Sequence, residues 1–172
     1  QPLALRPQPV GHAFGNATNS FVSGFYWGGW DIARGVVMAP TSTAGSPAGY
    51  VLDGWGGVHS FGNAPALTHS GYWPGWDIAN GIALNPDGKG GYVLDGWGGL
   101  HGIGNAGTVN NGPYWYGWDI ARGVASTGNG PGASGYVLDG FGGIHPFGSA
   151  PGGSPPPTYW GSDVARAIAV AP

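Results

Sequence analysis

The chain has 172 residues, of which 38 are Gly and 16 are Pro, and this many helix-breaking residues argue against an α-helical bundle or an α/β sandwich. A net charge of −3 with only 8% charged residues provides no basic patch for nucleic acid, and the apolar runs are too short for a membrane span. The lack of Cys excludes disulfides, thiolate metal sites and Cys nucleophiles.

Aromatic residues oppose the disorder that this Gly and Pro content would otherwise indicate. The chain has 9 Trp, 8 Tyr and 6 Phe, which is more ring surface than a solvated chain carries. We therefore expect one compact all-β domain over residues 1–172. Scarce Lys, absent Glu and abundant Gly, Asn, Ser and Thr are typical of exported proteins, so we expect an extracellular or cell-surface location.

In chain order, the first apolar segment is Leu3-Ala4-Leu5-Arg6, and three predicted strands follow at residues 32–39, 50–53 and 58–61. Gly54-Trp55-Gly56-Gly57 turns the second of these strands tightly into the third. A Tyr-Trp segment before the first strand is either a short outer strand or an ordered loop. The same set recurs along the chain, and the strands that correspond to residues 32–39 cover 78–84, 120–125 and 164–171.

Two motifs recur with these strands. Gly-Tyr-Val-Leu-Asp-Gly occupies residues 49–54, 91–96 and 135–140. Trp-Asp-Ile-Ala, or a variant of it, contains the four residues Asp31, Asp77, Asp119 and Asp163. These Asp residues are separated by 46, 42 and 44 residues, and joining the chain ends would make the interval from the last to the first equal to 40. Four nearly equal intervals therefore use the whole chain.

This spacing predicts a closed four-bladed β-propeller with ~43 residues in each blade. Residues 3–6 stand where residues 50–53 stand in the next unit, so the N-terminal strand and the C-terminal strand 164–171 would complete one blade between them. Another four-fold β-assembly or an open stack is the alternative. An open solenoid would need distinctive capping repeats, and the sequence has none.

The four recurring Asp residues precede the strand that we expect to be innermost in each blade. If they ring the mouth of a central channel, their oxygen atoms could hold a structural cation there. The metal candidates are Asp31, Asp77, Asp119 and Asp163. In the alternative, each carboxylate accepts backbone N–H groups of its own turn, and Arg34, Arg122 and Arg166 neutralise the charge nearby. We expect no other cofactor.

Four His residues share one position on the third strand of each unit: His12, His59, His101 and His145. Because that strand is not innermost, these side chains should point into separate spaces between blades, half-buried and hydrogen-bonded rather than bound to metal. A pair with Asp53, Asp95 or Asp139 is one way to satisfy them. Arg6 replaces the Asp in the remaining unit, so the sequence contains no four-fold acid–base site.

Catalysis has little support in this sequence. The residues that break the symmetry are Arg6, His69, Lys89 and Ser162, and they lie in different units with no catalytic motif around them. The sequence also lacks Gly-x-Ser-x-Gly, a phosphate-binding loop and any Glu. We therefore expect that the protein is not an enzyme.

The recurring aromatic residues are the most informative functional signal. Flat rings beside Asp and Asn suit sugars, which combine an apolar face with hydroxyl edges, although large rings can equally fill the gaps between Gly-rich sheets. Rings at the Gly-bounded hairpin tips should be the most exposed. The ligand-binding candidates are the three hairpin aromatics and the three Trp residues that precede an Asp: Trp55, Trp97, Phe141, Trp30, Trp76 and Trp118.

The repeat also resembles a known class of sequences. Gly-Tyr-Val-Leu-Asp-Gly-Trp-Gly-Gly-Val-His-Ser-Phe-Gly-Asn-Ala, with Asn-Pro-Asp-Gly-Lys-Gly ahead of one copy, is similar to Gly- and aromatic-rich β-repeats of secreted and cell-surface bacterial proteins, notably from actinobacteria. The resemblance covers all four units, although residues 1–9 share only the apolar pattern. It implies an exported, repeat-built β structure and carries over no catalytic residue.

Two functions follow from these observations. The first is a non-enzymatic extracellular module that binds glycans or cell-surface polymers at repeated, equivalent sites. The second is a structural subunit that self-associates into an extracellular filament, sheath or tube, since low net charge removes the repulsion that keeps proteins monomeric.

Overall fold

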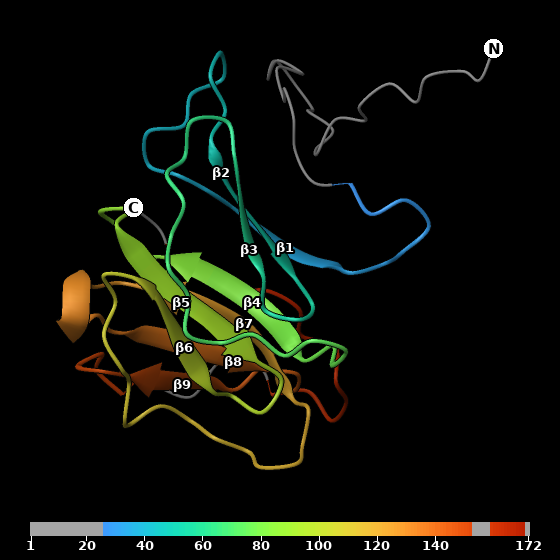
Figure 1. Cartoon of the computed structure of the whole chain (residues 1–172). Coiled ribbons are helices and arrows are strands. Elements are labelled where there is room, and N and C mark those ends of the chain that lie inside the picture. Colours follow the sequence, from blue (N-terminus) through green and yellow to red (C-terminus); the bar gives the residue numbers. More distant parts are fainter. Residues whose placement is uncertain (1–25, 153–158, 171–172) are drawn as a thin grey trace.

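The computed structural model describes residues 26–152 and 159–170, and Figure 1 shows their arrangement. Their regular elements are nine strands and one short 3₁₀ helix, η1 (Gly130–Gly132). The first sheet contains β1 (Ala33–Met38), β2 (Gly49–Asp53) and β3 (Val58–Phe61). The second contains β4 (Ala79–Leu84), β5 (Gly90–Asp95) and β6 (Leu100–Gly104). The third contains β7 (Ala121–Ser126), β8 (Gly135–Asp139) and β9 (Ile144–Phe147).

Each sheet is an antiparallel meander with the same order and register. In the first sheet, Val51 of the central strand lies opposite Val36 on one side and His59 on the other. Val93 and Val137 hold the corresponding places in the other two sheets. The predicted all-β repeat is therefore confirmed, and the strand bounds agree with the sequence-based ones to within one or two residues.

A register shift interrupts the first strand of every sheet at the same place. It lies between Ala33 and Gly35 in β1, and corresponding shifts occur in β4 and β7. The residue inside the shift is Arg34, Asn80 or Arg122. A bulge redirects the side chain of the extra residue. These three polar side chains point toward the next unit, where each donates a hydrogen bond to an Asp.

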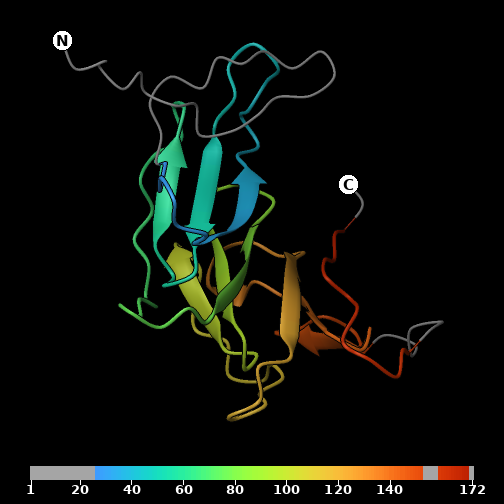
Figure 2. The same cartoon turned by 90° about the vertical axis from the view of Figure 1, so that its right-hand side faces the viewer.

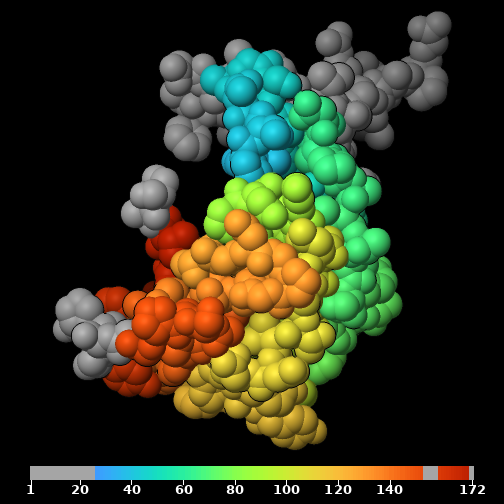
Figure 3. Space-filling view, turned by 90° about the vertical axis from the view of Figure 1, so that its left-hand side faces the viewer, coloured from blue at the N-terminus to red at the C-terminus, as the bar shows by residue number. Residues whose placement is uncertain are grey.

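The three sheets and the C-terminal segment follow one another in space in the order of the chain. Figure 2 shows β1, β4, β7 and the red C-terminal segment in an arc, and Figure 3 shows the successive units layered from cyan to red. Small residues allow the close approach of neighbouring first strands: a Cβ atom on Gly35 would lie 3.3 Å from Ile82, and one on Gly81 would lie 3.5 Å from Val124. The molecule is thus an open row of similar units in its described part.

The apolar core lies between consecutive sheets. Leu52 of the first sheet packs with Ala79, Val93 and Ile103 of the second. The larger cluster joins the second sheet to the third and contains Tyr92, Leu94, Ala121, Val137 and Phe147, among others. Each sheet therefore buries its faces mainly against the sheet before it and the sheet after it, as repeat architectures do.

The structure decides between the two alternatives for the Tyr-Trp segments and differs from one expected strand. The Tyr-Trp segments are turns rather than outer strands, closed by bonds such as Trp76 N–H to the Trp73 carbonyl (3.0 Å). Residues 164–170 were expected to form a strand, but no strand is assigned there, because none of the described residues pairs with them in a ladder. Leu3 to Arg6 and His12 lie outside the described residues.

Candidate functional site

A buried Asp builds each hairpin tip. Asp53 Oδ1 accepts the backbone N–H groups of Trp55 and Gly57, both at 2.9 Å, and Asp53 Oδ2 lies 2.7 Å from His59 Nε2. Gly56 between them has φ +89°, a conformation that favours Gly. The same contacts recur around Asp95 and Asp139, at 2.8–2.9 Å. The predicted His–Asp pair is therefore confirmed in the three described units, and it holds the tip aromatic in place.

The Trp of the Tyr-Trp segment packs against this His in each of the three units. The ring centroids of Trp73 and His101 are 4.6 Å apart, nearly perpendicular, and the Trp27–His59 and Trp115–His145 contacts are similar. Trp73 also covers the previous hairpin, since a Cβ atom on Gly56 would lie 2.8 Å from its ring. These Trp rings therefore serve as packing between units, the role that the sequence analysis weighed against ligand binding.

The six candidate aromatics come together as three pairs, each with one exposed and one half-buried ring. The hairpin-tip rings were expected to be the most exposed, but Trp55, Trp97 and Phe141 are half-buried, because each packs against its partner ring. The ring centroids are 5.1 Å apart in Trp30–Trp55, 5.3 Å in Trp76–Trp97 and 5.9 Å in Trp118–Phe141. Both rings of a pair belong to the same unit, one from the hairpin tip and one from the turn before the first strand. Trp30, Trp76 and Trp118 remain 48%, 47% and 52% exposed, so each pair presents ring surface to solvent.

Tyrosines of the next unit extend two of the pairs. Tyr114 and Tyr116 lie 6.4 and 4.9 Å from Trp97, and Tyr159 stacks on Phe141 at 5.8 Å with an interplanar angle of 19°. These three Tyr residues are not among the candidates predicted from the sequence. The signal for them is the Tyr-Trp dipeptide: Trp115 N–H donates to the Trp97 carbonyl at 2.7 Å, which brings the preceding Tyr114 beside the hairpin tip.

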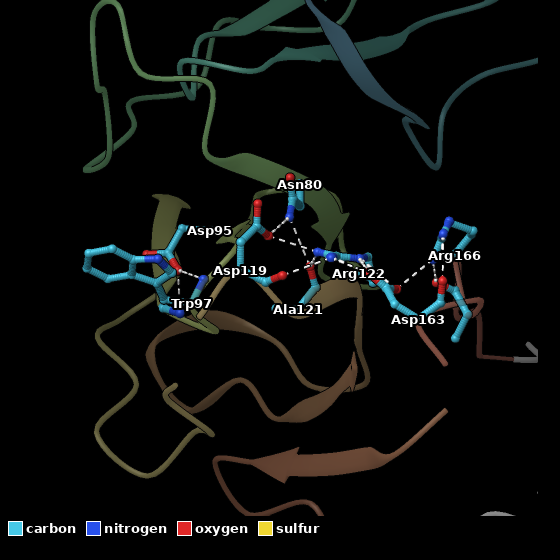
Figure 4. A network of polar contacts seen from close by, with 10 residues as sticks. Asn80, Asp95, Trp97, Asp119, Ala121, Arg122, Asp163 and Arg166 are labelled. Atoms are coloured by element: carbon cyan, nitrogen blue, oxygen red, sulfur yellow. Dashed lines mark hydrogen bonds and ion pairs between the residues drawn. The ribbon is translucent and has the colours of Figure 1, made fainter. Parts of the chain in front are cut away.

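A row of polar contacts runs across the first strands of consecutive units (Figure 4). Asn80 Nδ2 donates to Asp119 Oδ1 at 2.9 Å, and Arg122 binds both Asp119 (2.8 Å) and Asp163 (2.6 Å). The hydrogen bonds from Arg122 and then from Arg166 lower the pKa of Asp163 below its ordinary value. The sequence analysis paired each Arg with the Asp of its own unit, but the bulge lets it reach the next unit as well.

Three of the four predicted metal candidates thus face a guanidinium or amide group of the preceding unit: Asp77, Asp119 and Asp163. Asp31 contacts Arg34 of its own unit at 3.5 Å. Within residues 26–152 and 159–170, no group of three or more His or Asp side chains could hold a metal ion. A cation held by all four Asp residues stays a prediction.

The described residues that break the repeat lie apart from one another in the chain. His69 forms an isolated bridge with Ile103 and lies 6.2 Å from Tyr72, Lys89 is in the turn between β4 and β5, and Ser162 precedes the C-terminal segment. Arg6 is outside the described residues. None of the helical structure in the described part is long and apolar enough to cross a membrane.

Comparison with protein-family models, with curated proteins and with solved structures gave no match to this chain.

Proposed function

We propose that the chain is a non-enzymatic extracellular binding module that recognises glycans or cell-surface polymers through repeated aromatic sites. The observation that carries this proposal is the set of three ring pairs at equivalent places in the three sheets, each with one Trp exposed to solvent. A ring that only filled a gap between sheets would be covered, and Trp73 is partly buried in this way. The Trp that precedes the Asp in each pair instead keeps about half of its surface in solvent.

The chemistry around each pair suits a sugar. In every pair the exposed Trp is followed directly in the sequence by an Asp, as in Trp76 and Asp77, and a carboxylate of this kind can accept hydrogen bonds from hydroxyl groups. The two rings are nearly perpendicular in Trp76–Trp97, at 72°, which provides a ring face and a ring edge to one ligand. A pyranose has the matching combination of an apolar face and a polar rim.

Repetition supports a polymer rather than a single small ligand. The three sites belong to one packed body, so a chain molecule that occupies one site meets the others at a high effective concentration. Avidity from such linked sites can exceed the affinity of a single site by about 10²–10⁴. Weak individual sites are therefore sufficient for firm attachment to a polysaccharide or a cell surface.

The proposed frame for these sites is a closed four-bladed propeller. In this proposal residues 3–6 and 164–170 form the missing strands of a fourth sheet, and the resemblance to secreted bacterial β-repeats fits the same arrangement. Support comes from the four nearly equal intervals in the sequence. The backbone N–H groups of Val164 and Ala165 also donate to the Gly140 carbonyl, at 2.8 and 2.9 Å. Ile120 and Ala121 donate to the Gly96 carbonyl in the same way, so the C-terminal segment begins as a further unit of the repeat would.

A second candidate function is a subunit of an extracellular filament, sheath or tube. The exposed apolar residues at the two ends of the row favour it: Val36 and Met38 on β1, and Val164 and Val170 in the C-terminal segment. Light scattering on the purified protein distinguishes the two functions, because a binding module stays monomeric whereas a filament subunit forms large particles.

Binding to a panel of soluble polysaccharides, followed by affinity electrophoresis, tests the proposal. The wild-type chain should be retarded by at least one polysaccharide, and the variant with Trp30→Ala, Trp76→Ala and Trp118→Ala should migrate freely. The matched control is Ile144→Ala, which removes an exposed apolar side chain outside the pairs and should bind as the wild type does. Equal retardation of the triple variant would contradict the assignment of the sites, and no retardation by any polysaccharide would contradict glycan binding.

A further inference from the structure

Consecutive units are joined by the same polar contact at every described junction. Arg34 Nε donates to Asp77 Oδ1 at 2.9 Å, and Arg122 Nε donates to Asp163 Oδ1 at 3.1 Å. In both cases the guanidinium reaches from the bulge of one first strand to the Asp that precedes the next. Asn80 makes the shorter equivalent of this contact with Asp119 at the second junction.

The apolar contact beside it is also repeated. The residue after each bulge is Gly35, Gly81 or Gly123. It faces a side chain of the next unit, and that side chain comes one residue after the counterpart of this Gly in the next unit. That neighbour is Ile82, Val124 and Ile168 in turn. The contact with Gly81 helps to bury the Val124 side chain, which is only 6% exposed. A junction between units therefore needs a donor and a small residue on one side, and an Asp and a β-branched residue on the other.

Each end of the row has one side of such a junction without the other side. The first unit has the Asp and the β-branched residue, and the C-terminal segment has the donor and the small residue. At the first end, the Asp31 side chain is fully exposed, and Val36, the counterpart of Val124, is 64% exposed. At the last end, Arg166 binds Asp163 through Nη1 and the Asp163 carbonyl through Nη2. Its Nε, the atom that reaches the next unit in Arg34 and Arg122, has no partner among the described residues.

We infer that the surface formed by Val36 of β1 and by Asp31, which precedes β1, is the docking surface for Arg166 and Ala167 of the same chain. This inference rests on the proposed four-unit ring and names the contact that closes it. Arg166 would reach Asp31 as Arg122 reaches Asp163. Ala167 would cover Val36, and a methyl group fits in this place, because a Cβ atom on Gly81 would lie 3.5 Å from Val124, an ordinary contact.

The same chain is the occupant because it carries both halves in matching register and holds them at the two ends of one arc (Figure 2). Tethering gives the two ends an effective concentration in the millimolar range, above that of a second copy at ordinary protein concentrations. The charges are also complementary, with an exposed carboxylate at one end and a guanidinium with a spare donor at the other.

Disulfide trapping tests this contact directly, because the natural chain has no Cys. The double variant Val36→Cys with Ala167→Cys should form a disulfide within the monomer on mild oxidation, seen as faster migration on a non-reducing gel. The positive control is Gly81→Cys with Val124→Cys, which joins a described junction, and each single-Cys variant is the negative control. Disulfides between copies only, or no disulfide while the positive control forms one, would overturn the inference.

A charge reversal provides an independent measurement that needs no Cys. Arg166→Asp should lower the Tm, and Asp31→Arg in the same chain should restore part of the loss by exchanging the two charges across the junction. If Asp31→Arg lowers the Tm by the same amount with or without Arg166→Asp, the two residues do not meet. Neither measurement involves a sugar, so failure of the closing contact and failure of glycan binding are separate results.

Discussion

Three Asp side chains determine the shape of the candidate sites at the scale of single residues. Asp95 is almost fully buried, accepts two backbone N–H groups and contacts His101. His101 in turn supports Trp73, so one carboxylate fixes both the hairpin tip and the packing beneath it. This network thereby holds the hairpin-tip ring in place beside the exposed Trp of its pair.

Replacing one of these carboxylates should destabilise the fold. Asp95→Ala leaves the N–H groups of Trp97 and Gly99 and the ring of His101 without their acceptor, and each buried unpaired group costs about 1–3 kcal/mol. We expect a loss of about 3 kcal/mol in the free energy of unfolding, measured by urea denaturation. Asp87→Ala, an exposed Asp that accepts one N–H from Lys89, is the control and should change stability by less than ~0.5 kcal/mol.

The lowered pKa of Asp163 makes the last junction sensitive to acid. Hydrogen bonds from Arg122 favour the ionised carboxylate in the folded protein, so the folded-state pKa lies below the unfolded one. The stabilisation is present above the unfolded pKa and is lost as the pH falls through the folded-state pKa. NMR titration of the Asp163 carboxyl should show a midpoint below 3.8 that rises in Arg122→Gln. An unchanged midpoint in that variant would contradict the role of Arg122.

Close approach between consecutive units decides the arrangement at the scale of elements. The Gly that follows each central strand accepts two N–H groups from the next unit through its carbonyl, as Gly96 does from Ile120 and Ala121 at 2.8 and 3.0 Å. The same Gly lies against the Asp119 carboxylate, so that a Cβ atom there would collide with it. The Gly after each buried Asp (Gly54, Gly96 and Gly140) is thus a point of contact with the following unit.

Gly96→Ala should therefore weaken the junction between the second and third sheets. The added methyl must displace the Asp119 carboxylate, which Asn80 and Arg122 hold, and overpacking of this kind costs about 1–3 kcal/mol. Thermal unfolding measures the effect. Gly45→Ala is the matched control, because nothing lies within 4 Å of a Cβ atom there and its Tm should stay the same or rise. A smaller loss in Gly96→Ala than in the control would contradict this packing.

For the whole molecule, periodic motifs predict the units and the pairing within them. Gly-Tyr-Val-Leu-Asp-Gly with its downstream His is enough to place β2, β3 and the tip aromatic, because these contacts are local. The six candidate aromatics were also identifiable, since a tip and a turn of one unit meet in the fold.

Contacts between units were harder to predict. Arg34 and Asp77 are 43 residues apart, and whether they meet depends on a bulge that sequence periodicity does not reveal. The same holds for Tyr114, which reaches a hairpin tip of the preceding unit. Residues 164–170 have the apolar pattern of a first strand, but a strand also requires a ladder partner, and a pattern in one segment says nothing of where that partner lies.

In the proposed function, the three ring pairs are equivalent binding sites for a glycan. Isothermal titration calorimetry with a short oligosaccharide, taken from the polysaccharide that retards the protein, counts them directly. We expect three molecules bound to each chain, one for each ring pair, and two after Trp76→Ala. Binding of a single molecule that is unaffected by Trp76→Ala, or no binding to any oligosaccharide, would contradict it.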